Sequence, residues 1–196
     1  SAKAETEIAH ARHQTAKLAA AMLSAATQAK PDHAYLRRKD VSPPATLGEI
    51  EANKAAAILG YPPKCKGSVL EGRLLVAPVT VGGRISTLEL IDGAGRKAAL
   101  AGRGTKSGGY WAAQPLPDGA GDNSTLLIGE GVATVLSAID APGHTGIAAL
   151  SAGNLSAVAK IMRERYPAAD IVILADLIKA TGEPDQRATE AARVAG

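Results

Sequence analysis

The feature that most constrains this chain is a regular alternation of short apolar runs and helical segments over its last third. In chain order the pattern predicts strand 126–129, helix 132–140, strand 146–150, helix 155–166, strand 171–175 and helix 186–194. This order is typical of βαβ units with right-handed crossovers and a parallel sheet. We therefore expect an α/β fold in which three strand ends meet at one edge of the sheet.

Two of these predicted strands are followed by an acid. Glu130 follows Leu126-Leu127-Ile128-Gly129, and Asp176 follows the run 171–175. Open α/β sheets bind ligands at the carboxyl ends of their strands, and neighbouring carboxylates repel unless a cation intervenes or one is protonated. Such an acid can also be a general acid or base, a helix cap or a solvated loop residue, although glutamate is a poor cap. Because Mg²⁺ is commonly held by one or two carboxylates, our hypothesis is that Glu130 and Asp176 hold a divalent metal.

The composition excludes several other classes of site. The single Cys65 excludes an intramolecular disulfide and a Cys-rich zinc site. Aromatic residues make up 3% of the chain, which disfavours base-stacking platforms, and a net charge of +3 does not by itself indicate nucleic-acid binding. No apolar run is long enough to span a membrane, so a cytoplasmic location is expected. Because the chain begins at Ser1 without Met and ends inside a helical pattern, we expect a fragment of a longer polypeptide.

The N-terminal part is expected to be helical. An Ala-rich helix is predicted from Glu5 to about Ala29, and Thr46-Leu47-Gly48-Glu49 has the pattern of a capping box that opens a helix through Ile58. Between them, the segment 33–39 is the densest basic cluster, and it includes Arg37 and Arg38. This cluster is either a solvated helix end or a nucleic-acid contact.

From Val69 to Trp111 the sequence predicts short strands separated by glycine turns. Basic residues follow on glycine-rich loops, where backbone amides can approach phosphate oxygens closely; they are Arg96, Lys97, Arg103 and Lys106. The run 102–106 lacks the Walker spacing and does not join a strand to a helix, so a Walker site is disfavoured. A Pro/Gly/Asp linker at 115–123 is the predicted domain boundary.

Three motifs carry a resemblance to a known family. The segments 128–134 (IGEGVAT), 148–155 (AALSAGNL) and 173–176 (ILAD) resemble the Toprim domain of primases and topoisomerases, above all that of plasmid, phage and conjugative-element primases. Upstream, 33–39 is similar to the HPYLxRK segment of the plasmid proteins, and 73–79 to the β-rich subdomain before Toprim in bacterial primases. The likeness covers residues 31–196.

The resemblance implies a Toprim-like Rossmannoid parallel sheet (βαβαβα) preceded by a β-rich subdomain and N-terminal helices. The expected parts are an N-terminal helical region at 1–66, a β-rich primase-like subdomain at 67–115 and a Toprim domain at 124–196. A complete Toprim domain can extend beyond residue 196, so the C-terminus of this one can be truncated.

The family's functional residues carry over only in part. The resemblance implies that Glu130 acts in phosphoryl transfer and metal binding, and that Asp176 is the first aspartate of an Asp-x-Asp motif. Ile178 stands where the second aspartate is expected, and Asp185 is not counted as its replacement. Loss of one acid should weaken metal affinity, because ligand charge supplies much of the binding of a hard cation.

These residues lead to a first hypothesis and two alternatives. The first is a primase catalytic-core fragment that makes RNA primers on single-stranded DNA from ribonucleoside triphosphates with Mg²⁺ or Mn²⁺, and that has a replicative helicase or relaxase as partner and no membrane contact. Its expected nucleic-acid and nucleotide contacts are Arg37, Arg38, Arg73, Lys97, Arg103 and Lys106. The second is a degenerate, non-catalytic Toprim module that binds nucleic acid or a replication or conjugation partner. The third is small-molecule phosphotransfer or nuclease action.

Overall fold

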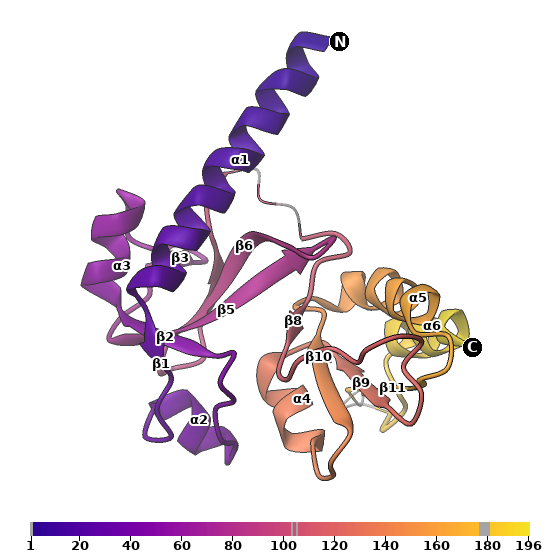
Figure 1. The fold of residues 1–196 in the computed structure, drawn as a ribbon. Coiled ribbons are helices and arrows are strands. Elements are labelled where there is room, and N and C mark those ends of the chain that lie inside the picture. Colours follow the sequence, from indigo (N-terminus) through magenta and orange to yellow (C-terminus); the bar gives the residue numbers. More distant parts are fainter. Residues whose placement is uncertain (1, 103, 105, 177–180) are drawn as a thin grey trace. The chain divides into compact units, whose positions relative to one another are not determined.

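The computed structural model describes residues 2–102, 104, 106–176 and 181–196. Two compact units follow each other along the chain, Ser1–Lys106 and Ser107–Gly196 (Figure 1). The expected three-part division, with limits at residues 66 and 115, stays a prediction. Among the described residues, no helix combines the length and apolar character that a membrane crossing requires.

The first unit is built on an antiparallel sheet of five strands in the order β1-β2-β5-β6-β7. A separate two-stranded hairpin, β3-β4, lies between α3 and β5 along the chain. The elements of the unit are α1 (Ala2–Ala25), β1 (Thr27–Gln28), α2 (Ala34–Lys39), β2 (Gly48–Glu51), α3 (Ala52–Leu59), β3 (Lys64–Cys65), β4 (Ser68–Val69), β5 (Arg73–Val81), β6 (Arg84–Ile91) and β7 (Lys97–Ala99).

Helix α1 covers one face of this sheet. Alternate residues of β5 and β6 point to that face, and Leu74, Val76, Leu88 and Leu90 join the core with Met22 of α1. All five side chains are fully buried. The buried residues of α1 lie in its C-terminal half, and its N-terminal half projects beyond the sheet (Figure 1).

The predicted capping box at Thr46-Leu47-Gly48-Glu49 is wrong. Gly48–Glu51 forms strand β2, and α3 begins only at Ala52. Pairing with β5 buries Ile50 in the apolar core of the unit, a tertiary gain that a local capping pattern does not report. The first helix likewise ends at Ala25 rather than at Ala29, because Thr27–Gln28 pairs with β2.

The second unit has the predicted α/β architecture. Its sheet runs in the order β11-β9-β10-β8, in which β9 is parallel to both β10 and β11. The elements are β8 (Trp111–Ala112), β9 (Thr125–Gly129), α4 (Val132–Ala138), β10 (His144–Ala148), the 3-10 turn η1 (Ala152–Asn154), α5 (Leu155–Arg165), β11 (Asp170–Ile173) and α6 (Gln186–Ala195). Strand β8 begins at Trp111, where the predicted stretch of short strands ends, and it pairs antiparallel with β10.

Helices cover both faces of this second sheet. Leu126 and Ile128 of β9 belong to a core with α5 and α6, whereas a Cβ on Gly129 would face Val135 of α4 and Leu174. A Cβ on Gly129 would lie 3.1 Å from Cγ1 of Val135, so glycine at this position allows α4 to pack closely on the strand. This close packing positions the residue that follows, Glu130.

Candidate functional site

The carboxyl ends of β9 and β11 open onto a pocket of about 310 Å³. The two strands are parallel neighbours with Ile128 opposite Ile173, so the residues that follow them emerge at the same edge. Glu130 and Asp176 both line this pocket, as their positions after the strands predicted. Their role as metal ligands stays a prediction.

The backbone at Glu130 is fixed by the neighbouring strand end. Leu150 donates its N–H to the Glu130 carbonyl at 2.7 Å, and Ala149 donates to the Gly129 carbonyl at 2.8 Å. Leu150 makes its contact with a φ of 66°, a left-handed conformation that costs an L-residue about 1–2 kcal/mol. The backbone hydrogen bonds that join β9 to β10 therefore continue beyond the two strands as far as Glu130.

The donor chemistry of the pocket suits a hard divalent cation. Glu130 and Asp176 supply carboxylate oxygens, and Mg²⁺ commonly binds one or two carboxylates together with waters and substrate phosphates. Within the described part of the chain, no group of three or more His, Cys, Asp or Glu side chains is arranged to hold a metal. Position 178, where the family has its second aspartate, lies outside the described residues.

Asp185 and Arg187 also line the pocket. The Asp185 side chain accepts the Arg187 N–H at 2.8 Å and so caps α6, while its own N–H donates to the Asp176 carbonyl at 3.0 Å. Asp185 therefore lies near the predicted metal ligands, and its side chain serves as a helix cap.

Asn154 has a role that the sequence did not reveal. Asn154 stands at the N-cap position of α5, but its side chain makes no cap bond. Its Nδ2 donates to the Gly109 and Ala149 carbonyls at 2.7 and 2.9 Å, and its Oδ1 accepts the Gly108 N–H at 2.7 Å. The side chain thus ties the Gly108-Gly109 turn to the end of β10. The signal for this role in the sequence is an asparagine that directly precedes Leu155, the apolar first residue of α5.

The predicted phosphate-binding residues differ in how strongly the protein holds them. Lys97 is exposed on β7, and Arg37 is exposed in the last turn of α2. Arg38 is also exposed, but Nη1 donates to the Gly93 carbonyl at 2.8 Å and its guanidinium lies 5.6 Å from the centre of the Tyr35 ring. Arg103 lies outside the described residues.

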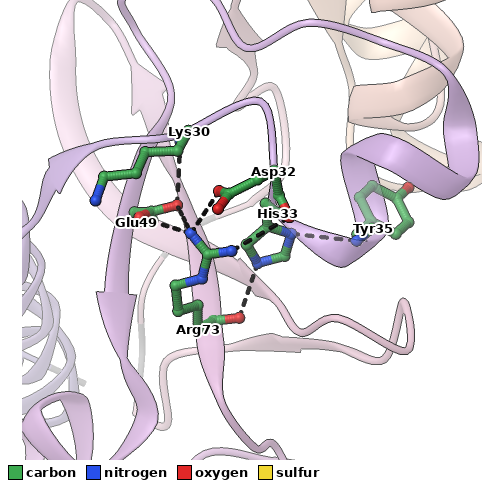
Figure 2. Close-up of polar contacts among 6 residues, drawn as sticks. All are labelled: Lys30, Asp32, His33, Tyr35, Glu49 and Arg73. Atoms are coloured by element: carbon green, nitrogen blue, oxygen red, sulfur yellow. Dashed lines mark hydrogen bonds and ion pairs between the residues drawn. The ribbon is translucent and has the colours of Figure 1, made fainter.

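Arg73 is held by two carboxylates. Its Nη1 lies 2.8 Å from Oδ1 of Asp32 and 3.3 Å from Oε1 of Glu49, as Figure 2 shows. Glu49 also accepts the Lys30 N–H at 3.1 Å. A phosphate at Arg73 would have to compete with two carboxylates, so its predicted contact is less well supported than that of Lys97.

Buried His33 connects α2 to the strand that carries Arg73 (Figure 2). Its Nδ1 accepts the Tyr35 N–H at 3.3 Å, and its Nε2 lies 2.8 Å from the Arg73 carbonyl. Because a carbonyl can only accept, Nε2 carries the proton and Nδ1 does not. The basic segment 33–39 is therefore anchored to the sheet by its first residue.

The Asp32–Arg73 pair leads to a prediction on acid stability. The hydrogen bond from Arg73 lowers the pKa of Asp32 below its usual 3.8. A carboxyl of this kind contributes stability above its unfolded pKa and loses it as the pH falls through the folded pKa. Below pH 3.8, wild type should therefore lose slightly more stability than Asp32→Asn in urea unfolding, a small effect because the side chain is 67% exposed. Parallel pH curves for the two proteins would contradict the assignment.

Comparison with known proteins finds similarity over part of the chain. The Toprim domain matches residues 125–195. Two Escherichia coli proteins named DNA primase TraC are 43% and 41% identical to the chain over 51 residues, or 26% of its length. That stretch covers only 5% and 4% of the two relatives.

Two solved structures are also similar, but only loosely. The crystal structure of the primase fragment of the bacteriophage T7 primase-helicase protein superposes with a TM-score of 0.46 and 12% identity, over 87% of this chain and 60% of the other. A structure of the T7 lagging-strand DNA polymerase with primase domains of two gp4 subunits gives 0.44 and 16%, over 62% and 60%. The strand-end acids Glu130 and Asp176 and the parallel strands that carry them all lie within residues 125–195, the stretch that the Toprim domain matches.

Proposed function

We propose that this chain is part of a primase catalytic core that makes RNA primers on single-stranded DNA from ribonucleoside triphosphates. The observation that carries the proposal is the pocket shared by Glu130 and Asp176 at adjacent strand ends of a Toprim domain. The two relatives named DNA primase TraC also support a primase function. A replicative helicase or a relaxase is the proposed protein partner.

In the proposed reaction, Glu130 and Asp176 would hold Mg²⁺ or Mn²⁺. A divalent cation there supplies charge that neutralises the triphosphate oxygens. The ties from β10 keep Glu130 in place, which favours a fixed alignment of the reacting groups. The residues proposed to contact template or nucleotide phosphates are Lys97, Lys106, Arg103, Arg37, Arg38 and Arg73. These contacts act through positioning and charge neutralisation, with no covalent intermediate on the protein.

Glu130→Gln tests the catalytic proposal. Primer synthesis on single-stranded DNA with four ribonucleotides and Mg²⁺ or Mn²⁺ is expected to fall by roughly two orders of magnitude or more, because the amide keeps the side-chain shape but loses the charge. Glu183→Gln, which changes an exposed acid outside the pocket, is the matched control and should keep wild-type activity. Equal activity of wild type and Glu130→Gln would reject the catalytic proposal.

A degenerate, non-catalytic Toprim module is the second candidate. It is favoured by Ile178 at the position of the second aspartate, and by the lack of a three-ligand metal group among the described residues. Titration calorimetry with Mn²⁺ distinguishes the two. A catalytic core should give binding heat that Asp176→Asn reduces, whereas heat that is absent or independent of Asp176 would favour the degenerate module.

A further inference from the structure

Glu89 is an acid buried in the sheet of the first unit. It lies on β6 and pairs with Ala77 of β5 on one side and Ala99 of β7 on the other. Its side chain is only 4% exposed. A carboxylate in such a place is costly unless a cation or hydrogen-bond donors compensate for the lost water.

Lys106 is the cation that compensates Glu89. Its Nζ donates to Oε2 of Glu89 at 2.9 Å, and its own side chain is 35% exposed, so the ion pair lies at the border between interior and solvent. The backbone two residues before Lys106 lies directly against β6. A Cβ on Gly104 would lie 2.8 Å from Cβ of Thr87, which is two residues before Glu89 on β6.

Stability alone does not account for this pair. Oε1 of Glu89 is buried and, among the described residues, has no hydrogen-bond partner, and the same holds for Oγ1 of Thr87. Apolar residues in place of a buried ion pair are often neutral or stabilising. The negative charge of Glu89 also acts on a neighbouring side chain. Burial of Tyr35 is the main cause that raises its pKa, and the charge of Glu89 is the second.

We infer that Glu89 sets the affinity of Lys106 for phosphate by acting as a built-in counter-charge. The inference rests on the proposed function, in which Lys106 contacts phosphate groups of the template or nucleotide. A phosphate that approaches the ammonium does so against the repulsion of the carboxylate behind it. Between unit charges several ångströms apart near a protein surface, this repulsion exceeds the thermal energy.

Glutamine at position 89 separates charge from geometry. Its side-chain oxygen can still accept a hydrogen bond from Lys106 Nζ, so the lysine keeps its anchor while the negative charge is lost. If the carboxylate served mainly to hold the lysine in place, Glu89→Gln would leave phosphate binding unchanged or weaken it. If the carboxylate opposes the incoming phosphate, the same substitution tightens binding.

The test is the binding of a fluorescein-labelled oligo(dT) to the chain, followed by anisotropy over a range of salt concentrations. Glu89→Gln is expected to bind roughly three- to tenfold more tightly than wild type. The slope of log K against log salt should become steeper by about 0.7, the value for one phosphate contact on a single strand. Glu71→Gln is the matched control, because it removes the same charge from a carboxylate of the first unit that is 81% exposed. It should change affinity by less than about twofold.

Three results would overturn the inference: unchanged or weaker binding by Glu89→Gln, an equal gain in Glu71→Gln, or no binding by either wild type or Glu89→Gln. Urea unfolding verifies that the variants are folded, and Glu89→Met replaces Glu89→Gln as the charge-free variant if the latter does not fold. Tighter binding by Glu89→Gln in a protein that makes no primers would reject the catalytic proposal and leave this inference supported.

Discussion

Lys106→Met is expected to destabilise the first unit by about 3 kcal/mol, because it leaves the Glu89 carboxylate buried without its cation. The expected loss lies at the lower end of the range for broken buried pairs, since the Lys106 side chain is 35% exposed. Urea unfolding followed by circular dichroism measures it as a lower midpoint at a similar slope.

The double variant Glu89→Gln/Lys106→Met is the control for this prediction. Removing both charges removes the unpaired buried carboxylate, so the double variant should recover most of the stability that Lys106→Met loses. Simple addition of the two single effects would contradict the view that Lys106 compensates Glu89. The double variant is also the better reference for binding, because a defect in Lys106→Met alone would combine lost charge with lost stability.

Asn154→Ala is expected to cost about 3 kcal/mol, because it removes three buried hydrogen bonds at once. The Gly108 N–H and the Gly109 carbonyl then lose the partner that ties their turn to β10. The loss should appear in urea unfolding, and hydrogen exchange at Gly108 should become faster than in wild type.

Two further variants make the Asn154 prediction specific. Asn154→Asp keeps the acceptor for Gly108 but loses both N–H donors, so it should also be destabilised. Gln28→Ala removes an exposed amide that bonds the Pro44 carbonyl at 2.8 Å, and it should cost less than about 1 kcal/mol. A loss in Asn154→Ala no larger than that in Gln28→Ala would show that the three bonds contribute little.

The sequence predicted the second unit well, because its strands and helices are specified by local patterns. The apolar runs of β9 to β11 and the helical spacing between them placed every one of these elements within a few residues. The same logic placed Glu130 and Asp176 at one edge, since parallel neighbouring strands end together. Their chemistry as ligands stays a prediction.

The parts that the sequence did not predict depend on contacts between distant residues. Strand β2 replaced a predicted helix start because β5 pairs with it, and β8 pairs with β10, a strand more than 30 residues later in the chain. The Glu89–Lys106 pair joins residues 17 apart, and Asn154 binds a turn 45 and 46 residues earlier. No local periodicity reports such pairings.

The short strand β8 determines where a fragment of this protein can be cut. Trp111–Ala112 covers the edge of β10, and Ala113 donates its N–H to the Gly146 carbonyl at 2.8 Å. A fragment that began at residue 124 would match the family yet leave the backbone of a buried strand exposed as a new edge, which is a template for intermolecular pairing. Expression of this unit as a monodisperse protein therefore requires residues 111 and 112, which lie upstream of the segment that the Toprim domain matches.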